Sequence, residues 1–383
     1  MLALTYRGPG KVRVVEKREP KIEHPNDVIL RVTRATICGS DVHLYHGYVP
    51  DTRVGDTFGH EFTGVVTEIG SSVERLQRGD RVVVPFNIAC GTCFACERGL
   101  TSLCENTNPC STLVGGVFGY SHITGGYDGG QAEYVRVPFA DVGPLKIPDD
   151  MSDEDVLFLS DIIPTGFQAA EMADIGPDDT VAVFGCGPVG LVAQRSAWLL
   201  GAKRVIGMDY VEDRLAFARR WAQSETIDLR SHKDIVTHLR KLTDGRGPDV
   251  CIDAVGLEAE GSRLHDVLGK VLKLEAGAPT SIEWSIGAVR KGGTVSLIGV
   301  YGPPWNLVPI GTAMNKGLVM RMGQCNVKRY LPRLLEHIRV GAIDAKGLIT
   351  HRFGLEEAED AYRMFAARRD GIIKCTLVPP GVA

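Results

Sequence analysis

A glycine-rich turn between an expected strand and an expected helix is the feature that most constrains the fold of this chain. The turn reads Gly185-Cys186-Gly187-Pro188-Val189-Gly190 and matches the pattern G-x-G-x-x-G. An apolar run over residues 180–185 precedes it, and a helical pattern over residues 188–200 follows it. An acidic residue, Asp209, ends the next expected strand about 20 residues later. This order of elements predicts a dinucleotide-binding unit.

Each glycine of this turn has a physical role in holding a pyrophosphate. Gly185 permits the tight turn, Gly187 lets the backbone approach the phosphates, and Gly190 lets the helix pack closely on its strand. Pro188 and Val189 begin the helix, whose N-terminus carries the positive end of the helix dipole and attracts anions. The alternative is a glycine-rich turn that holds no ligand.

Two side chains beyond the turn bear on the choice of cofactor. Asp209 would accept hydrogen bonds from the hydroxyls of the adenine ribose and would repel the extra phosphate of NADP, so NAD is the expected cofactor. Arg214 lies nearby in the sequence and would stack on the adenine. The alternative for Arg214 is an ordinary solvated charge on a helix.

Hydrophobic patterning changes character along the chain. Short apolar or β-branched runs bounded by Gly, Pro and Asp make the first part β-rich, at residues 12–15, 27–33, 64–69 and 80–84. After Asp150, expected strands alternate with expected helices, at residues 180–185, 188–200, 204–209, 212–221, 248–254 and 294–299. Such alternation is typical of a parallel sheet with helices on both faces.

The end of the chain has the pattern of two amphipathic helices. The apolar face of the first consists of Leu331, Leu334, Leu335 and Ile338, and that of the second consists of Leu355, Ala358, Tyr362 and Phe365. We therefore expect an α/β protein in two domains. A β-rich catalytic domain covers residues 1–161, with residues 323–383 returning to it, and a doubly wound Rossmann cofactor domain covers residues 162–322.

Composition and charge exclude several classes of protein. The 383 residues are 44% hydrophobic and 23% charged, and the net charge of −4 gives no electrostatic footprint for nucleic acid. No stretch approaches the roughly 18 consecutive apolar residues of a membrane span, and the first residues lack the apolar core of a signal peptide. The sequence predicts a cytoplasmic protein without nucleic-acid or membrane partners.

Half of the ten cysteines fall in one short stretch of the chain. Cys90, Cys93, Cys96 and Cys104 offer four thiolates, which suit a closed tetrahedral zinc site with no position left for a substrate. A reducing compartment favours a metal over disulfides here. An iron–sulfur cluster and a redox switch remain alternatives, and Cys110 is surplus to a site with four ligands.

A second set of metal-binding residue types is scattered through the sequence. It comprises Cys38, the pair His60-Glu61, and Asp161 shortly before the expected cofactor domain. Each of these is unremarkable by itself. Together with the four-cysteine stretch, Pro164-Thr165-Gly166 and the glycine-rich turn, they make the chain resemble the zinc-dependent medium-chain alcohol dehydrogenases along nearly its whole length. The resemblance implies a GroES-like fold for the catalytic domain.

The resemblance also implies roles for individual residues. Cys38, His60 and Asp161 would bind a catalytic zinc, which gives two zinc ions per subunit together with the cysteine site. Glu61 would be an exchangeable ligand, and Asp41 would orient His60. The residues that would act on the substrate or cofactor are Ser40, at the substrate hydroxyl; His43, passing its proton to solvent; Thr165, near the nicotinamide; and Lys374, near the pyrophosphate.

One branch of this family resembles the chain most closely. The liver-type enzymes have Cys where this chain has Asp161, whereas aspartate occurs in secondary-alcohol dehydrogenases and in glutathione-independent formaldehyde dehydrogenases. The stretches 84–91, 129–134 and 159–166 look closer to the formaldehyde dehydrogenases. Residues 257–285 exceed what a minimal unit needs. They would either cover the adenine end of a tightly held NAD or form a surface insertion.

The resemblance implies hydride transfer from an alcohol or an aldehyde hydrate to NAD, with zinc as the Lewis acid and Ser40 and His43 as a proton relay. Formaldehyde oxidation or dismutation is the specific expectation. The alternatives are a broad primary, secondary or polyol alcohol dehydrogenase and a non-enzymatic nucleotide-binding relative. The partner would be a small alcohol or aldehyde. A homo-oligomer is implied, with a tetramer favoured over a dimer.

Overall fold

The computed structural model describes residues 1–256, 280–301 and 308–382. The chain divides into two compact units, one formed by Met1–Pro164 with Asn326–Ala383 and the other by Thr165–Cys325. Sequence analysis places the corresponding junctions after residues 161 and 322. The first junction lies inside a helix, α4 (Ile162–Met172), which the strand pattern did not predict. Most of the 257–285 segment lies outside the described residues.

Unit 1 is built on a seven-stranded sheet. Its strands lie in the order β16-β17-β3-β4-β5-β9, and β8 also pairs with β3. Most pairs are antiparallel, and β16 and β17 pair in parallel. The strands are β3 (Val28–Thr36), β4 (Phe62–Ile69), β5 (Arg81–Val84), β8 (Tyr134–Val137), β9 (Leu145–Lys146), β16 (Ile349–Gly354) and β17 (Lys374–Val378).

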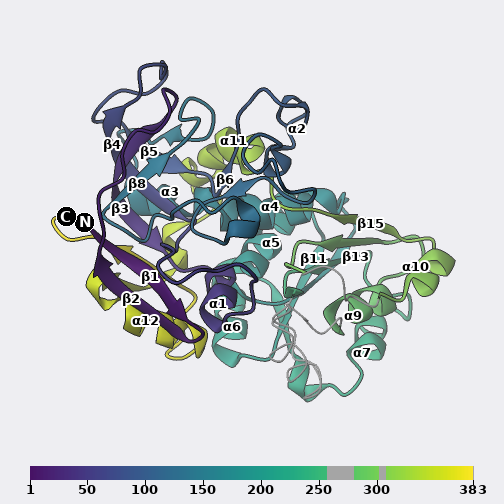
Figure 1. The fold of residues 1–383 in the computed structure, drawn as a ribbon. Helices are drawn as coiled ribbons and strands as arrows, with labels where there is room; N and C mark the ends of the chain where they lie inside the picture. The colour runs from purple at the N-terminus through teal and green to yellow at the C-terminus, as the bar shows by residue number, and fades with distance from the viewer. Residues whose placement is uncertain (257–279, 302–307, 383) are drawn as a thin grey trace. The chain divides into compact units, whose positions relative to one another are not determined.

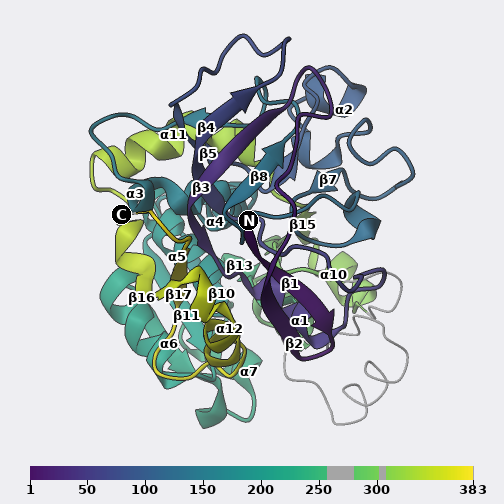
Figure 2. The same ribbon diagram turned by 60° about the vertical axis from the view of Figure 1, so that its left-hand side comes forward.

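The two ends of the chain meet in unit 1. The N-terminal hairpin of β1 (Leu2–Gly8) and β2 (Lys11–Glu16) contacts α12 (Ala358–Ala366), as Figures 1 and 2 show. The predicted apolar face of α12 is confirmed, since Ala358, Tyr362 and Phe365 are buried in the same core as strands β3 and β4. The C-terminal segment therefore supplies part of the core around the first sheet.

Unit 1 also contains one long helix and several short elements. Helix α11 (Val327–Arg339) buries Leu331 and Leu334 as predicted, together with Val327 and Tyr330, and the predicted Leu335 and Ile338 are half-buried. Gly341 follows its end with a φ of 71°, a backbone conformation that glycine adopts readily. The others are α1 (Gly39–His46), α2 (Phe94–Glu97), α3 (Asp153–Val156), β6 (Asn87–Ile88) and β7 (Gly116–Val117).

Unit 2 is a six-stranded, all-parallel sheet in the order β12-β11-β10-β13-β14-β15. This order is that of the doubly wound dinucleotide-binding fold, in which the strand order reverses between β10 and β13. The predicted fold class is confirmed. The strands are β10 (Thr180–Phe184), β11 (Arg204–Asp209), β12 (Glu225–Asp228), β13 (Val250–Asp253), β14 (Thr294–Leu297) and β15 (Val319–Met322).

Helices cover both faces of this sheet (Figure 1). Alternate residues of β10 enter two different cores, because successive side chains of a strand point to opposite faces. Val181 and Val183 pack with α4 and α5 (Pro188–Leu199), whereas Ala182 and Phe184 pack with α7 (Ile235–Lys241) and α9 (Thr280–Ala288). Burial on both faces explains why the strand is almost entirely apolar.

Three details of unit 2 differ from the sequence-based expectation. The helix predicted over residues 212–221 is α6 (Glu212–Phe217) followed by a π-helical turn at Ala218–Ala222. Strands β12 and β15 were not predicted, because both are edge strands with exposed residues and lack a long apolar run. Helix α10 (Ile310–Lys316) lies before β15. None of the helices in the described ranges has the length and apolarity needed to cross a bilayer.

Two candidate metal centres and a glycine-rich turn

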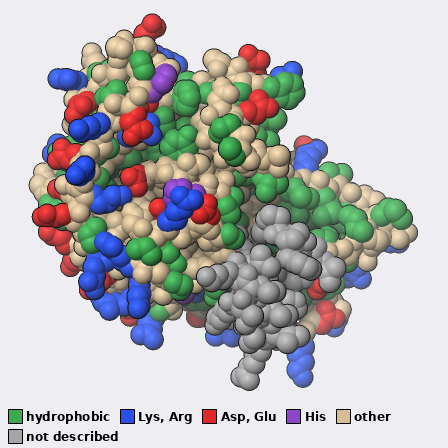
Figure 3. Space-filling view, in the orientation of Figure 1, with side chains coloured by type: hydrophobic (Ala, Val, Ile, Leu, Met, Phe, Trp, Pro, Cys, Tyr) green, Lys and Arg blue, Asp and Glu red, His purple; other side chains and the backbone are tan. Residues whose placement is uncertain are grey.

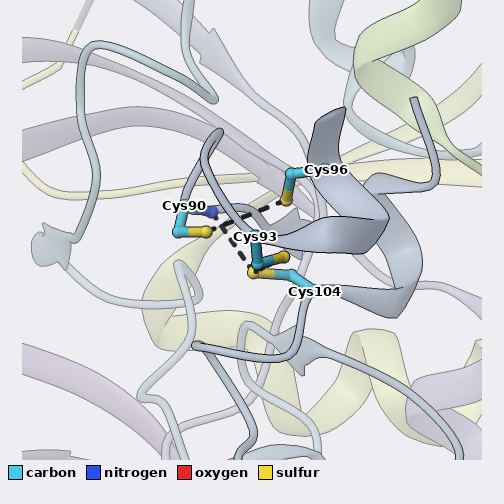
Figure 4. A group of neighbouring side chains, drawn as sticks. All are labelled: Cys90, Cys93, Cys96 and Cys104. Carbon is cyan, nitrogen blue, oxygen red and sulfur yellow. Dashed lines mark hydrogen bonds between the residues drawn. The ribbon is translucent and has the colours of Figure 1, made fainter. Parts of the chain in front are cut away.

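The four predicted cysteines converge in unit 1 (Figure 4). Cys90 follows β6, Cys93 caps the N-terminus of α2, Cys96 lies within α2, and Cys104 follows a single helical turn at Thr101–Leu103. The sulfurs of Cys90 and Cys96 are 4.0 Å apart, and those of Cys93 and Cys104 are 3.9 Å apart. Four sulfurs around a tetrahedral zinc lie about 3.8 Å apart, so these two separations are close to those of a zinc site.

Hydrogen-bond donors surround the Cys90 sulfur. The backbone N–H and the hydroxyl of Thr92 donate to it at 3.4 and 3.7 Å, and the Asn106 amide donates at 3.3 Å. Burial works against ionisation, but hydrogen bonds from the Thr92 N–H and hydroxyl, from the Cys93 N–H and from the Cys104 side chain lower the pKa of Cys90 to about 6. A thiolate is the form that binds metal, so the local backbone prepares this ligand before any ion arrives.

Cys38, His60, Glu61 and Asp161 form the second cluster, also within unit 1. Cys38 caps the N-terminus of α1, His60 and Glu61 directly precede β4, and Asp161 lies between a helical turn at Leu157–Ser160 and α4. Asp161 Oδ2 lies 3.5 Å from Cys38 Sγ and 3.4 Å from His60 Nε2. Tetrahedral zinc separates sulfur from oxygen by about 3.6 Å and nitrogen from oxygen by about 3.4 Å. The mixed donor set therefore also fits zinc.

The buried carboxylates and thiol of this cluster lie close enough to affect one another's ionisation. Burial, together with the carboxylates of Asp161 and Glu61, raises the pKa of Cys38 to about 11. Burial also raises the pKa of Glu61 to about 7, against the lowering effect of the Lys374 ammonium. Glu61 Oε2 is buried and has no hydrogen-bond partner among the described residues. A dication at this position would supply the missing positive charge.

Lys374 occupies a different environment from the one predicted for it. Its side chain is fully buried in β17, and its ammonium donates to Glu61 Oε1 at 2.6 Å and to the carbonyl of Ile37 at 2.8 Å. Lys374 is thus a buried partner for Glu61, because an unpaired carboxylate at this depth would be costly. Its predicted contact with a pyrophosphate stays a prediction.

The predicted proton-relay residues lie on the helix that Cys38 caps. Ser40 is half-buried in the first turn of α1, and His43 is buried one turn later. Asp41, between them, is fully buried, and its Oδ1 lies 3.2 Å from His60 Nδ1. This distance is compatible with the predicted role of Asp41, a carboxylate that orients the imidazole of His60, and the role itself stays a prediction.

The glycine-rich turn in unit 2 has the backbone that its sequence predicts. Gly185 has a φ of 95°, and Gly187 caps α5, in which Pro188 is the first residue. A Cβ on Gly190 would overlap the carbonyl oxygen of Gly185. Val189, next to it, is half-buried against the α4–α5 core. Gly185 is therefore required by its positive φ and Gly190 by a close approach, whereas Gly187 has a φ of −70° and room for a Cβ.

Asp209 ties the end of β11 to this turn. Its Oδ2 accepts from the backbone N–H of Cys186 at 2.8 Å, and its Oδ1 accepts from Tyr210 and Val211 at 2.7 and 2.9 Å. Arg214 Nη1 lies 4.0 Å from Asp209 Oδ2. Thr165, the remaining predicted cofactor residue, is half-buried in α4. The contacts of Asp209, Arg214 and Thr165 with a cofactor stay predictions.

Comparison with known proteins decides the family. Residues 24–149 match the model of the alcohol dehydrogenase GroES-like domain, and residues 188–270 match that of the zinc-binding dehydrogenases. An uncharacterised zinc-type alcohol dehydrogenase-like protein of Bacillus subtilis is 44% identical over 381 residues, which cover 99% of this chain and 100% of that protein. The chain belongs to the zinc-type alcohol dehydrogenase family. The predicted resemblance is confirmed.

Two further relatives are informative about this dehydrogenase. A glutathione-independent formaldehyde dehydrogenase of Pseudomonas aeruginosa is 41% identical over 308 residues, covering 78% of this chain and 74% of that protein. The structure of alcohol dehydrogenase TADH from Thermus sp. ATN1 superposes with a TM-score of 0.84 and 35% identity, covering 99% of this chain and 100% of that one. The dehydrogenase is thus an oxidoreductase with zinc and NAD as its cofactors, and the non-enzymatic alternative falls away.

Sequence analysis missed three residues around the mixed-donor cluster of this dehydrogenase. The ring of Phe86 lies edge-on to the His60 imidazole, with ring centroids 6.1 Å apart. Gln131 and Tyr362 form a buried hydrogen bond of 2.8 Å next to Asp41. Gln131 belongs to the family-like stretch 129–134, which was the available signal, whereas the apolar periodicity of α12 assigned Tyr362 to the core alone.

Proposed function

We propose that the chain is an NAD-linked dehydrogenase whose substrates include formaldehyde, taken as its hydrate, and that the reaction takes place at Cys38, His60 and Asp161. The observation that carries the proposal is this buried cluster of one thiol, one imidazole and one carboxylate at tetrahedral spacing. Zinc held there supplies a Lewis acid for the substrate oxygen, and NAD accepts the hydride. The likeness to a formaldehyde dehydrogenase supports the choice of substrate.

The chain's own residues perform the proton chemistry in this proposal. Ser40 receives the proton of the substrate hydroxyl, and His43, one turn along α1, passes it to solvent. Asp41 keeps the His60 imidazole in one orientation. Oxidation of the hydrate removes a hydride and a proton and leaves formic acid. If a second formaldehyde takes the hydride back from NADH, methanol forms and the net reaction is dismutation.

A general alcohol dehydrogenase is the second candidate. An alcohol dehydrogenase of Cupriavidus necator, 34% identical over 389 residues, favours it because the match covers 99% of each chain. Apolar pockets distinguish substrates that differ by a methylene by only about 1–3 kcal/mol, so an enzyme of this kind often accepts several alcohols.

The deciding experiment measures NADH formation by the purified protein without glutathione. Formaldehyde, ethanol, propan-2-ol and a polyol are compared, and formate and methanol are quantified by NMR. Formation of formate supports the proposal, and equal formate and methanol with little net NADH identify dismutation. Turnover of alcohols with no formate overturns the formaldehyde assignment in favour of the general dehydrogenase. The Cys38→Ser variant serves as the blank.

We further propose a cytoplasmic homo-oligomer, with a tetramer favoured. Strand β15 is an edge of the parallel sheet and exposes Val319 and Met322, and α10 exposes Ile310 and Met314 (Figure 3). Exposed apolar edge strands pair readily with a second copy. All ten cysteines are free thiols, which suits a reducing compartment. Light scattering of the wild type and of Met322→Lys tests the assembly, and cell fractionation tests the location.

A further inference from the structure

Gln131 is a buried polar residue that packs directly against the segment carrying His60. Its backbone N–H donates to the carbonyl of Phe58 at 3.0 Å, and its side chain fills the space beside Gly59. Gly59 has a φ of 99°, and a Cβ there would overlap the Gln131 side chain. The chain therefore brings this glutamine and the metal-ligating segment into close contact through backbone as well as side chain.

The amide of Gln131 is held at both ends. Its Nε2 donates to the carbonyl of Thr36 at 2.9 Å and to Asp41 Oδ2 at 3.3 Å, and its Oε1 accepts from the Tyr362 hydroxyl at 2.8 Å. The two acceptors, the Thr36 carbonyl and Asp41 Oδ2, fix which end of the amide faces the carboxylate, and the Tyr362 hydroxyl holds the opposite end. A flipped amide would place its oxygen against both acceptors and lose the two hydrogen bonds that Nε2 donates.

Asp41 connects this amide to the metal cluster. Its Oδ2 accepts from the backbone N–H of Cys38 at 2.9 Å as well as from Gln131, and its Oδ1 lies 3.2 Å from His60 Nδ1. One fully buried carboxylate thus contacts the segments of two of the three clustered donors. The orientation of the Asp41 carboxylate is set by the two donors to Oδ2, the backbone N–H of Cys38 and the side-chain amide of Gln131.

The hydroxyl of Tyr362 is not needed to fill the core. Its ring packs against Tyr45 and Phe58, with centroids 5.7 and 6.3 Å away, and these ring contacts do not involve the hydroxyl. Among the described residues, the hydroxyl makes one hydrogen bond, to Gln131. A buried hydroxyl costs free energy unless it is hydrogen-bonded, so a phenylalanine would satisfy the packing at least as well.

We propose that Gln131 and Tyr362 are positioning residues for the metal site. Tyr362 orients the Gln131 amide, Gln131 holds Asp41, and Asp41 holds the His60 imidazole at the angle at which Nε2 faces Cys38 and Asp161. The inference rests on the proposed function in one respect, namely that these donors bind the catalytic metal. Residues that orient a metal ligand typically change metal affinity by about 10–100-fold when they are replaced.

Tyr362→Phe and Gln131→Met test the proposal, and Tyr127→Phe is the matched control. Tyr127 lies in the same unit and donates one hydrogen bond, to the carbonyl of Thr107 at 2.9 Å, far along the chain from Asp41. Zinc retention is measured against a chromogenic chelator. The visible spectrum is recorded after Co²⁺ replaces zinc, because cobalt absorption reports ligand geometry.

Gln131→Met is expected to lower the affinity of one of the two zinc ions about tenfold. Tyr362→Phe is expected to lower the same affinity about fivefold, the effect of one typical hydrogen bond. Both variants shift the cobalt bands, and Tyr127→Phe leaves affinity and spectrum unchanged. Wild-type affinity and spectrum in Tyr362→Phe overturn the proposal, as does a change that Tyr127→Phe reproduces.

The Cys38→Ser variant separates this inference from the proposed function. If Cys38→Ser loses one zinc while Tyr362→Phe behaves as wild type, the metal site stands and the positioning role is wrong. If Cys38→Ser keeps both zinc ions, the metal site itself is wrong.

Discussion

The four-cysteine cluster and the mixed-donor cluster both present buried thiols at tetrahedral spacing, yet they are built in opposite ways. The first takes all its donors from residues 90–104 and stabilises a thiolate with local N–H groups. The second gathers donors from three distant segments, and burial raises the pKa of its Cys38 to about 11. The difference matches the proposed division between a closed structural metal site and a catalytic one.

The surroundings of the two clusters sharpen this contrast. All four donors of the cysteine cluster are thiols. The mixed cluster has a fourth group, Glu61, whose carboxylate is shared with Lys374 and has one unpartnered oxygen. A closed shell suits a structural metal, whereas an exchangeable donor suits a position where substrate must enter.

The largest expected effect comes from Cys38→Ser. We expect kcat/KM to fall at least about 10³-fold, because the Lewis acid contributes several kcal/mol to the reaction. Elemental analysis is expected to find one zinc per chain where the wild type has two. Retention of activity and of both zinc ions would show that the mixed cluster is not the catalytic site.

Cys93→Ser is expected to lower the stability of the fold and to leave catalysis almost unchanged, whereas Cys38→Ser is expected to lower activity. Losing a structural zinc removes binding energy that stabilises the fold, and a loss of about 4 kcal/mol lowers the melting temperature of a domain of this size by about 10 °C. The kcat of the protein that remains folded should stay within about twofold of wild type. Calorimetry and zinc analysis check this result.

Cys110→Ser is the matched control for Cys93→Ser, because Cys110 is exposed and lies outside the cluster. Its melting temperature should equal that of the wild type. Equal effects of the two substitutions would contradict a metal role for Cys93.

Lys374→Met tests the buried pair that distinguishes the mixed cluster. It leaves Glu61 without its 2.6 Å partner, and breaking a buried ion pair costs about 3 kcal/mol. Chemical denaturation measures the change. The double variant Lys374→Met/Glu61→Gln should recover part of the loss, since it removes both charges. If the free-energy change of the double variant equals the sum of the changes for the two single variants, the two groups do not act as a pair.

His43→Ala should have a smaller effect than Cys38→Ser, Cys93→Ser or Lys374→Met. We expect kcat to fall about tenfold below pH 7 and to recover at high pH, where hydroxide removes the substrate proton directly. Both zinc ions should remain bound. A pH profile of kcat parallel to that of the wild type would contradict the relay role.

Local features of the sequence were enough to predict much of this molecule. The spacing of four cysteines predicted one metal site, because the donors are close in the chain and a short loop brings them together. The glycine-rich turn and the acid at the end of β11 predicted the doubly wound sheet, because Gly185 and Gly190 meet steric demands of that turn. The edge strands β12 and β15 were not predicted, because their residues are mostly exposed or half-buried and form no apolar run in the sequence.

The mixed cluster could not be assembled from local patterns. Cys38, His60 and Asp161 are ordinary residues in their own segments, and a family resemblance was needed to group them. The resemblance could not place Lys374 beside Glu61, because its basic charge is visible in the sequence whereas its burial is not.

The sequence by itself therefore determined the fold class, the cysteine metal site and the nucleotide-binding turn, each of which depends on residues near one another in the chain. The tertiary structure alone decided what surrounds the mixed cluster. Lys374 reaches Glu61 from β17, and Tyr362 reaches Gln131 from α12, because the C-terminal segment folds back onto the first sheet. Such contacts join residues hundreds of positions apart, and no local pattern encodes them.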